Sequence, residues 1–147
     1  MDQKSKRGIW RGKPPASEAA IHQLTIDSRI ALPVSYLNQL RRSNGGEGDI
    51  GVEPGWIQFW KAEEVIENNL GYELGECLPG YFGFGSNGGG ELLAMKVYDP
   101  GRFSIYMIPF IVISEKDAVR IARDFDVLVE AVGVKWISPT AAQNEDS

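Results

Sequence analysis

The chain has 147 residues, which is the length of one domain with its own hydrophobic core. The chain has a single cysteine, which excludes an internal disulfide framework. It also has a single histidine, and one cysteine with one histidine is too few ligands for the usual zinc sites. No apolar run approaches the roughly 20 residues of a membrane helix, and no apolar stretch follows the charged N-terminus as in a secretory signal. We therefore expect a single cytoplasmic domain that binds no membrane.

Charge is distributed unevenly along the chain, whose net charge is −5. Residues 1–16 contain five basic side chains against Asp2, a net charge of +4, whereas residues 47–99 contain ten carboxylates against Lys61 and Lys96, a net charge of −8. An acidic middle repels nucleic acid and attracts basic proteins over long distances. The same charge is also typical of a surface that keeps a protein soluble, so both interpretations stay open.

The N-terminal third predicts an arm and two helices. Residues 1–16 lack apolar periodicity and end in two prolines, so we expect a flexible basic arm, of which only the pair Ile9–Trp10 could dock on the body of the domain. Ser17 is suited to cap a first, short helix. Pro33 suits the first position of a second helix, which the Asn-Gly-Gly sequence of residues 44–46 ends.

The rest of the chain predicts strands with one inserted helix, followed by a long C-terminal helix. The expected elements are short strands at 49–52 and 56–60, a helix at 61–70, a hairpin at 81–97, a strand buried on both faces at 104–113 and a helix from Ser114 to Val132. Pro109 indicates a bulge or an edge in the last strand. Ser114 begins a capping-box sequence, and the apolar residues after it follow at helical spacing.

This order of elements lacks a regular alternation of strands and helices. It predicts the α+β class: an antiparallel strand meander packed against helices, in a single domain over residues 17–137. Residues 138–147 are expected to be a polar tail.

Few side chains offer catalytic chemistry. His22 has no second histidine or cysteine near it in the sequence, and Cys77 would be a nucleophile only beside a base. Ser86 does not stand in the nucleophile elbow of hydrolases. Carboxylate pairs such as Glu63 and Glu67 are as typical of a solvated helix face. We expect no enzyme, no metal and no cofactor; an enzyme that uses His22 or Cys77 is the hypothesis to exclude.

Residues 83–91, Gly-Phe-Gly-Ser-Asn-Gly-Gly-Gly-Glu, allow two interpretations. A glycine-rich loop can bring its backbone against a phosphate, which would make Ser86–Gly90 a nucleotide or small-ligand site. Phosphate loops precede a helix, however, and here a second apolar run, Leu92–Val97, follows. Because Asn-Gly between two strand-forming runs is a strong hairpin signal, a structural turn is the favoured interpretation.

Several short motifs follow one another in a distinctive order. Leu32-Pro33-Val34-Ser35-Tyr36 leads to Asn44-Gly45-Gly46, Trp60 precedes a helix that begins Lys-Ala-Glu-Glu, and Gly85, Gly88 and Gly89 stand in the expected hairpin. Over about residues 17–133 this order resembles the SUKH superfamily, which includes the fungal Smi/Knr cell-wall regulators and many bacterial immunity proteins. Asn87 stands where that family usually has an acidic residue, and the basic arm has no counterpart in it.

The resemblance implies a non-enzymatic domain that binds and neutralises a cognate toxin, often a nuclease, of a polymorphic or contact-dependent toxin system. Since a nuclease presents a basic surface, the acidic middle of the chain fits this expectation, and no direct contact with nucleic acid is expected. The candidate contacts with a basic toxin domain are Glu47, Asp49, Glu53, Glu73, Glu76 and Glu91. The motif residues are expected to be structural. A regulator that binds a nucleotide or small ligand through the glycine-rich loop is the alternative.

Overall fold

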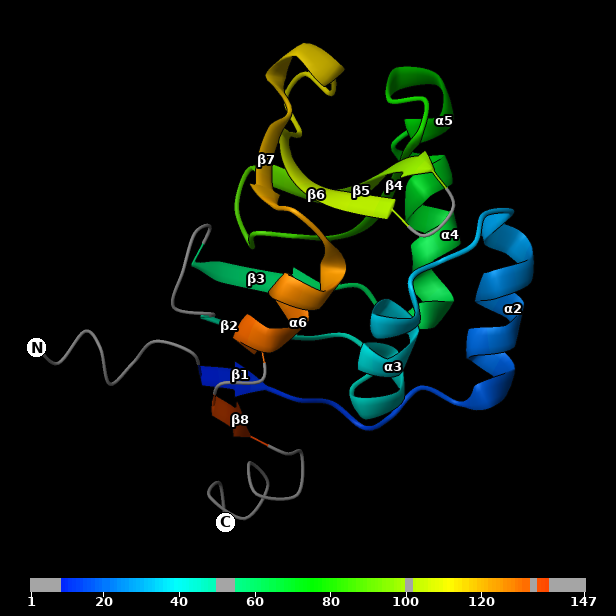
Figure 1. Ribbon diagram of the computed structural model, residues 1–147, viewed down its shortest axis with the longest axis vertical. Coiled ribbons are helices and arrows are strands. Elements are labelled where there is room, and N and C mark those ends of the chain that lie inside the picture. Colours follow the sequence, from blue (N-terminus) through cyan, green and yellow to red (C-terminus); the bar gives the residue numbers. More distant parts are fainter. Residues whose placement is uncertain (1–8, 50–54, 100–101, 133–134, 138–147) are drawn as a thin grey trace, which may run out of the picture.

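The computed structural model describes residues 9–49, 55–99, 102–132 and 135–137 (Figure 1). The described helices are α2 (Glu18–Ser28), α3 (Val34–Arg42), α4 (Ala62–Gly71), α5 (Leu74–Cys77) and α6 (Phe125–Val132), with a short 3-10 helix, η1 (Glu115–Asp117). The described strands are β1 (Ile9–Arg11), β2 (Gly46–Asp49), β3 (Trp56–Phe59), β4 (Tyr81–Ser86), β5 (Glu91–Asp99), β6 (Arg102–Pro109), β7 (Val119–Ala122) and β8 (Lys135–Ile137).

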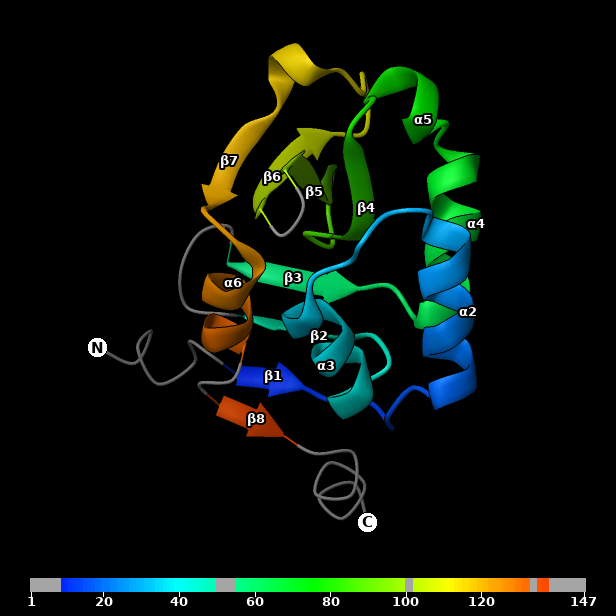
Figure 2. The same cartoon turned by 45° about the vertical axis from the view of Figure 1, so that its right-hand side comes forward.

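One sheet connects all eight described strands, in the order β7-β6-β5-β4-β3-β2-β1-β8. Neighbouring strands are antiparallel except β1 and β8, which are parallel. α3 and α6 lie side by side over β2 and β3, while α4, packed against α2, runs along one side of the molecule (Figures 1 and 2). The predicted class, a single α+β domain with an antiparallel strand meander packed against helices, is confirmed.

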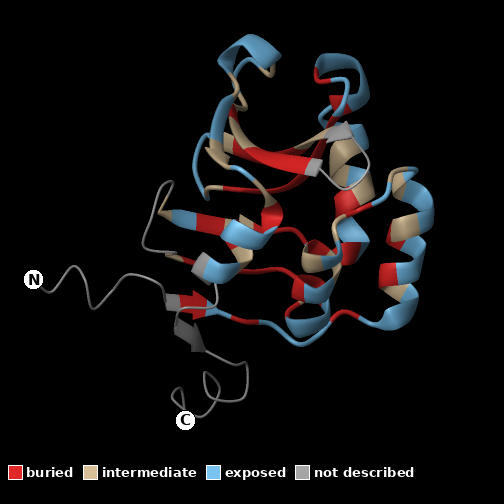
Figure 3. Cartoon of the chain, viewed as in Figure 1, coloured by how far each residue is buried: buried red, intermediate tan, exposed pale blue. Residues whose placement is uncertain are grey.

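Aromatic side chains hold these elements together. Tyr36 of α3, Phe59 of β3, Phe84 of β4 and Phe125 of α6 form one buried cluster, in which the ring centroids of Tyr36 and Phe125 are 5.1 Å apart and those of Phe84 and Phe125 5.2 Å apart. The rings meet edge-on or tilted, which is the favourable geometry for aromatic pairs. The buried residues concentrate in the strands and on the inward sides of the helices (Figure 3).

The predicted flexible arm is wrong for residues 9–16. β1 pairs with β2 and β8, and Trp10 is fully buried, with its ring centroid 5.2 Å from that of Phe59. Farther along, the Asn44 N–H donates to the Pro14 carbonyl (2.9 Å). Composition alone predicted an arm, but the buried indole and the strand ladder offset the cost of ordering this polar segment. Residues 1–8 and 138–147 lie outside the described part of the chain.

The long helix predicted from Ser114 to Val132 is also wrong. This segment contains η1, then β7 on the open side of β6, and only then α6. Asp124, not Ser114, caps the helix, because its Oδ1 accepts a hydrogen bond from the Val127 N–H (3.0 Å). The apolar spacing was compatible with one helix, but the free edge of β6 provides backbone partners that favour a strand at β7.

Several boundaries also differ from the prediction. β2 begins at Gly46 because Gly45 and Gly46, with φ of +92° and +104°, turn the chain directly from α3 into the sheet. The strand predicted at 104–113 ends at Pro109, which has no N–H for the ladder, and Ile111 beyond it is 91% exposed. α5 and β8 are elements that the sequence pattern did not predict.

A polar network ties η1 to the sheet. The Glu115 carboxylate accepts hydrogen bonds from the Tyr81 hydroxyl (3.1 Å) and from the Lys96 ammonium (2.9 Å). The bond from Lys96 is the main cause that lowers the pKa of Glu115. Burial, followed by the bond to Glu115, raises the pKa of Tyr81 to about 12. Burial also raises the pKa of Tyr36 in the aromatic cluster.

Alkaline titration should therefore show late ionisation of Tyr36 and Tyr81. Both pKa values are raised above the ordinary value of about 10, so both phenols stabilise the fold below pH 10, and this stability is lost as the pH rises through their folded-state pKa values. We expect tyrosinate absorbance to develop in two steps, and Tyr81→Phe to reduce the later one. A native protein whose tyrosines all ionise together near pH 10 would contradict this.

Candidate binding surfaces

The six carboxylates predicted as partner contacts do not form one surface. Glu47 and Asp49 are half-buried on β2, and Glu91 is half-buried at the start of β5, where it accepts a hydrogen bond from the Asn87 amide (2.6 Å). Glu73 and Glu76 are exposed at α5, which stands far from β2 in both views (Figures 1 and 2). Glu53 lies outside the described residues. Of the predicted contacts that the structure describes, Glu73 and Glu76 are the exposed ones.

α4 and α5 present a longer acidic stretch. Residues 62–77 contain five glutamates and neither lysine nor arginine, and all five glutamates are exposed. We define the α4–α5 surface by the exposed side chains Glu63, Glu64, Glu67, Leu70, Tyr72, Glu73 and Glu76. The sequence interpretation treated the carboxylates of α4 as a solvated helix face. The sequence feature that could have placed them among the predicted partner contacts is the absence of any lysine or arginine from residue 62 to residue 77.

The N-terminus of α4 is fixed by two side chains. Asn44 Oδ1 accepts a hydrogen bond from the Ala62 N–H (2.7 Å), and its amide donates to Glu63 (2.8 Å). The bond from Asn44 is the main cause that lowers the pKa of Glu63. Glu64 reaches back to the Lys61 N–H (3.2 Å) as in a capping box. Two carboxylates of the surface therefore also stabilise the helix that presents them.

Asn69 joins α4 to the sheet. Its amide accepts from the Gly83 N–H (2.8 Å) and donates to the Gly83 carbonyl (2.9 Å) and to the Val65 carbonyl (2.8 Å). The register of β3 and β4 covers Gln58 and Phe59 but does not reach Gly83, so the amide takes the place of a neighbouring strand there. These bonds and the capping at its other end hold α4, and with it the acidic side chains, in a fixed position.

The motif residues serve the fold. Leu32, Tyr36 and Trp60 are buried, and Pro33 is the N-cap of α3. Gly46 packs so closely that an added Cβ would lie 3.0 Å from the Trp10 indole nitrogen. In the structure these residues therefore lie in the core, at a helix cap and at a close-packed turn.

The glycine-rich turn satisfies much of its own backbone. Asn87 Oδ1 accepts from the N–H groups of Gly89 (3.0 Å) and Glu91 (3.1 Å), and Ser86 Oγ accepts from the Gly88 N–H (3.1 Å). The Asn87 N–H donates to the Glu91 carbonyl (3.1 Å). Since four N–H groups are bonded within the turn, they are not free to bind a phosphate. β4 and β5 flank this turn, so the predicted hairpin is confirmed.

The two candidate nucleophile and base side chains lie on separate elements. His22 is exposed on α2, and Cys77 is exposed at the end of α5. Within the described ranges, no group of three or more His, Cys, Asp and Glu side chains could hold a metal ion. No helix of the described part has the length and apolarity to cross a membrane.

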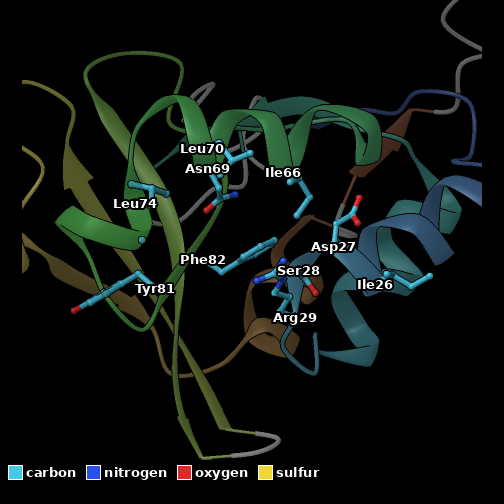
Figure 4. A pocket seen from close by; sticks show the side chains of 11 residues that line it. Ile26, Asp27, Ser28, Arg29, Ile66, Asn69, Leu70, Leu74, Tyr81 and Phe82 are labelled. Carbon is cyan, nitrogen blue, oxygen red and sulfur yellow. The ribbon is translucent and has the colours of Figure 1, made fainter.

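A groove of about 650 Å³ lies beside the α4–α5 surface (Figure 4). Four elements contribute to it: the C-terminal part of α2, α4, α5 and the start of β4. Its apolar side chains are Ile26, Ile66, Leu70, Leu74 and Phe82, and its polar ones are Asp27, Ser28, Arg29, Asn69 and Tyr81. The sequence interpretation missed this groove, because no local pattern brings residues 26 and 82 together.

Comparison with protein families identifies a match over most of the chain. The model of the SMI1 / KNR4 family (SUKH-1) matches residues 15–131, which is most of the chain and includes every helix and strand from α2 to β7. No curated protein matches the chain.

Proposed function

Because the chain belongs to the SMI1 / KNR4 family (SUKH-1), we propose that it is a bacterial immunity protein, which binds a cognate toxin and neutralises it in the cytoplasm without catalysis. The toxin proposed is of the nuclease type. Such an enzyme must present a basic surface to its substrate, and an acidic protein that covers this surface blocks it.

The observation that supports this proposal best is the α4–α5 surface. It carries five carboxylates without a basic residue from 62 to 77, beside the exposed apolar side chain of Leu70 and the partly exposed ring of Tyr72. Aromatic and apolar contacts surrounded by complementary charge are typical of protein interfaces. Trp60 stacks on Tyr72 with ring centroids 6.1 Å apart, so the ring is held in place before a partner binds.

Co-expression tests the proposal directly. The probe is the C-terminal domain of a large toxin encoded by the neighbouring gene, expressed in bacteria with and without this protein. We expect growth arrest by the toxin domain alone and full growth with both proteins. Unaltered killing in the presence of the folded protein would contradict the proposed function.

Charge reversal at α5 should slow association with that toxin domain. The double variant Glu73→Lys/Glu76→Lys is expected to reduce the association rate about ten-fold at low salt and much less at high salt, because long-range attraction is screened by ions. Stopped-flow fluorescence at two salt concentrations measures this. The control is Asp126→Lys/Glu130→Lys, which changes the net charge equally at exposed positions on α6. Equal slowing by both double variants would show that only net charge matters.

A further inference from the structure

We propose that the groove between α2, α4, α5 and β4 anchors a segment of the protein partner that carries a large apolar side chain next to lysine or arginine. This inference rests on the proposed function and adds to it a specific site and the side-chain chemistry of its occupant. The groove lies beside the α4–α5 surface and shares Leu70 with it.

The apolar lining is open to a partner. Leu70 is 74% exposed and Ile26 is 55% exposed, and they line the groove together with buried Phe82. The volume of about 650 Å³ is in the range of binding pockets, about 300–1,000 Å³, and exceeds what one side chain fills. A partner side chain that enters would remove these exposed apolar surfaces from water.

Most polar side chains of the groove already have partners within the fold. Asn69 bonds to Gly83 and Val65, the Tyr81 hydroxyl bonds to Glu115, and the Ser28 hydroxyl bonds to backbone carbonyls of α2 and the following residues. Asp27 accepts hydrogen bonds from Gln23 (3.0 Å and 3.1 Å). The groove therefore offers a polar ligand few unused groups and offers an apolar one a large surface.

Arg29 is the exception. Among the described residues it has neither a hydrogen-bonding side-chain partner nor an ion pair. Arg29 lines the groove at its α2 end (Figure 4). Its guanidinium has donors for the backbone carbonyls of an extended segment.

Charge indicates which residues flank the apolar side chain. Leu74 and Gly75 line the groove at α5, and their neighbours in sequence, Glu73 and Glu76, are exposed. This end is therefore acidic, whereas Asp27 and Arg29 both line the α2 end and their opposite charges offset each other. The basic residues of the occupant are expected at the α5 end.

Backbone strain supports the same location. Arg29 and Glu73 are the non-glycine residues of the described chain with positive φ, 60° and 55°. One lines the groove, and the other directly precedes Leu74, which lines it from α5. Side chains at left-handed backbone positions are costly and tend to occur at ligand sites.

Peptide libraries test the inference without the toxin. The probes are Ac-Lys-Lys-X-X-Lys-Lys-NH₂ and the matching Glu-flanked library, with X any natural residue, and fluorescence anisotropy measures binding to the full chain. We expect selection of Leu, Ile, Phe, Trp or Met at X in the Lys-flanked library, with affinity that falls as salt is added. Absence of binding, or selection of polar X, would overturn the proposal. Preferred binding of the Glu-flanked library would overturn it too, by indicating an anionic ligand on Arg29.

Matched variants localise the binding. Ile26→Gln/Leu70→Gln should lower the affinity of the selected peptide about ten-fold, because two apolar contacts are lost. Val34→Gln/Ile111→Gln changes two aliphatic side chains outside the groove that are 70% and 91% exposed, and should leave the affinity unchanged. Equal affinities of the two double variants would overturn the proposal. If the protein rescues growth but binds no peptide, the groove proposal is overturned and the proposed immunity function is not. If it binds the peptide but does not rescue growth, only the immunity function is contradicted.

Discussion

Replacement of Gly85 by alanine is expected to lower the free energy of unfolding by about 3 kcal/mol and the melting temperature by roughly 6–12 °C. An added Cβ would overlap the carbonyl oxygen of Gln58 and lie 3.2 Å from Phe59 Cα, both in the backbone of β3. β3 pairs with β2 on its other side, so it cannot yield without opening that ladder. Thermal unfolding followed by circular dichroism measures the change.

Gly90→Ala is the matched control for this prediction. Gly90 belongs to the same hairpin, but no atom lies within 4 Å of an added Cβ and its φ is not in the left-handed region. We expect its stability to change by no more than about 0.5 kcal/mol. If Gly85→Ala were as stable as this control, the inference that the backbone of β3 leaves no space for a side chain at Gly85 would be contradicted.

Local chemistry was predictable wherever neighbours in sequence determine the structure. Ser17 caps α2 as expected, since its hydroxyl accepts from the Ala20 N–H (3.0 Å). Asn87 and Gly88 form the hairpin turn as expected, with Gly88 at a φ of +76° that glycine adopts without strain. Both signals involve partners within four residues, so their pattern is complete in the sequence.

The errors occurred where distant partners decide the structure. Trp10 is buried against Phe59, 49 positions later in the chain, which the composition of the first sixteen residues does not indicate. β7 forms because β6 has a free edge, while the apolar spacing of its residues is equally compatible with a helix. Periodicity describes which residues share a face but not which backbone groups are available to them.

The candidate sites also divide into features that the local sequence indicates and features that depend on distant partners. Their carboxylates were visible in the sequence as charge, and Glu73 and Glu76 are indeed exposed on α5. The groove was not visible, because α2 and β4 are separated by more than fifty residues and meet only after α4 docks on the sheet. Asn69, whose amide bonds α4 to Gly83 of β4, is a polar residue of the helix predicted at 61–70, and its partner lies 14 positions later in the chain.

Asn69→Asp should therefore destabilise the protein by about 3 kcal/mol at neutral pH. The carboxylate can still accept from the Gly83 N–H, but it has no proton to donate to the carbonyls of Gly83 and Val65. Those two oxygens then face a negative charge, which raises the pKa of the introduced carboxyl above its unfolded value of about 3.9. The loss should thus be smallest in acid, where the carboxyl is protonated and can donate one bond, and should grow as the pH rises through the folded-state pKa.

Urea unfolding at acidic and neutral pH, always relative to the unaltered protein, measures this dependence. Asn68→Asp adds the same charge one residue earlier, at a side chain that makes no hydrogen bond within the described part of the chain. We expect the control to lose about 0.5 kcal/mol or less, without the deficit shrinking in acid. Because the two variants share their charge and their helix, only the bonds to Gly83 and Val65 separate them. The prediction would be contradicted if both variants lost the same free energy of unfolding, or if the loss of Asn69→Asp did not depend on pH. Either result would mean that the Asn69 amide does not hold α4, and with it the α4–α5 surface, on the sheet.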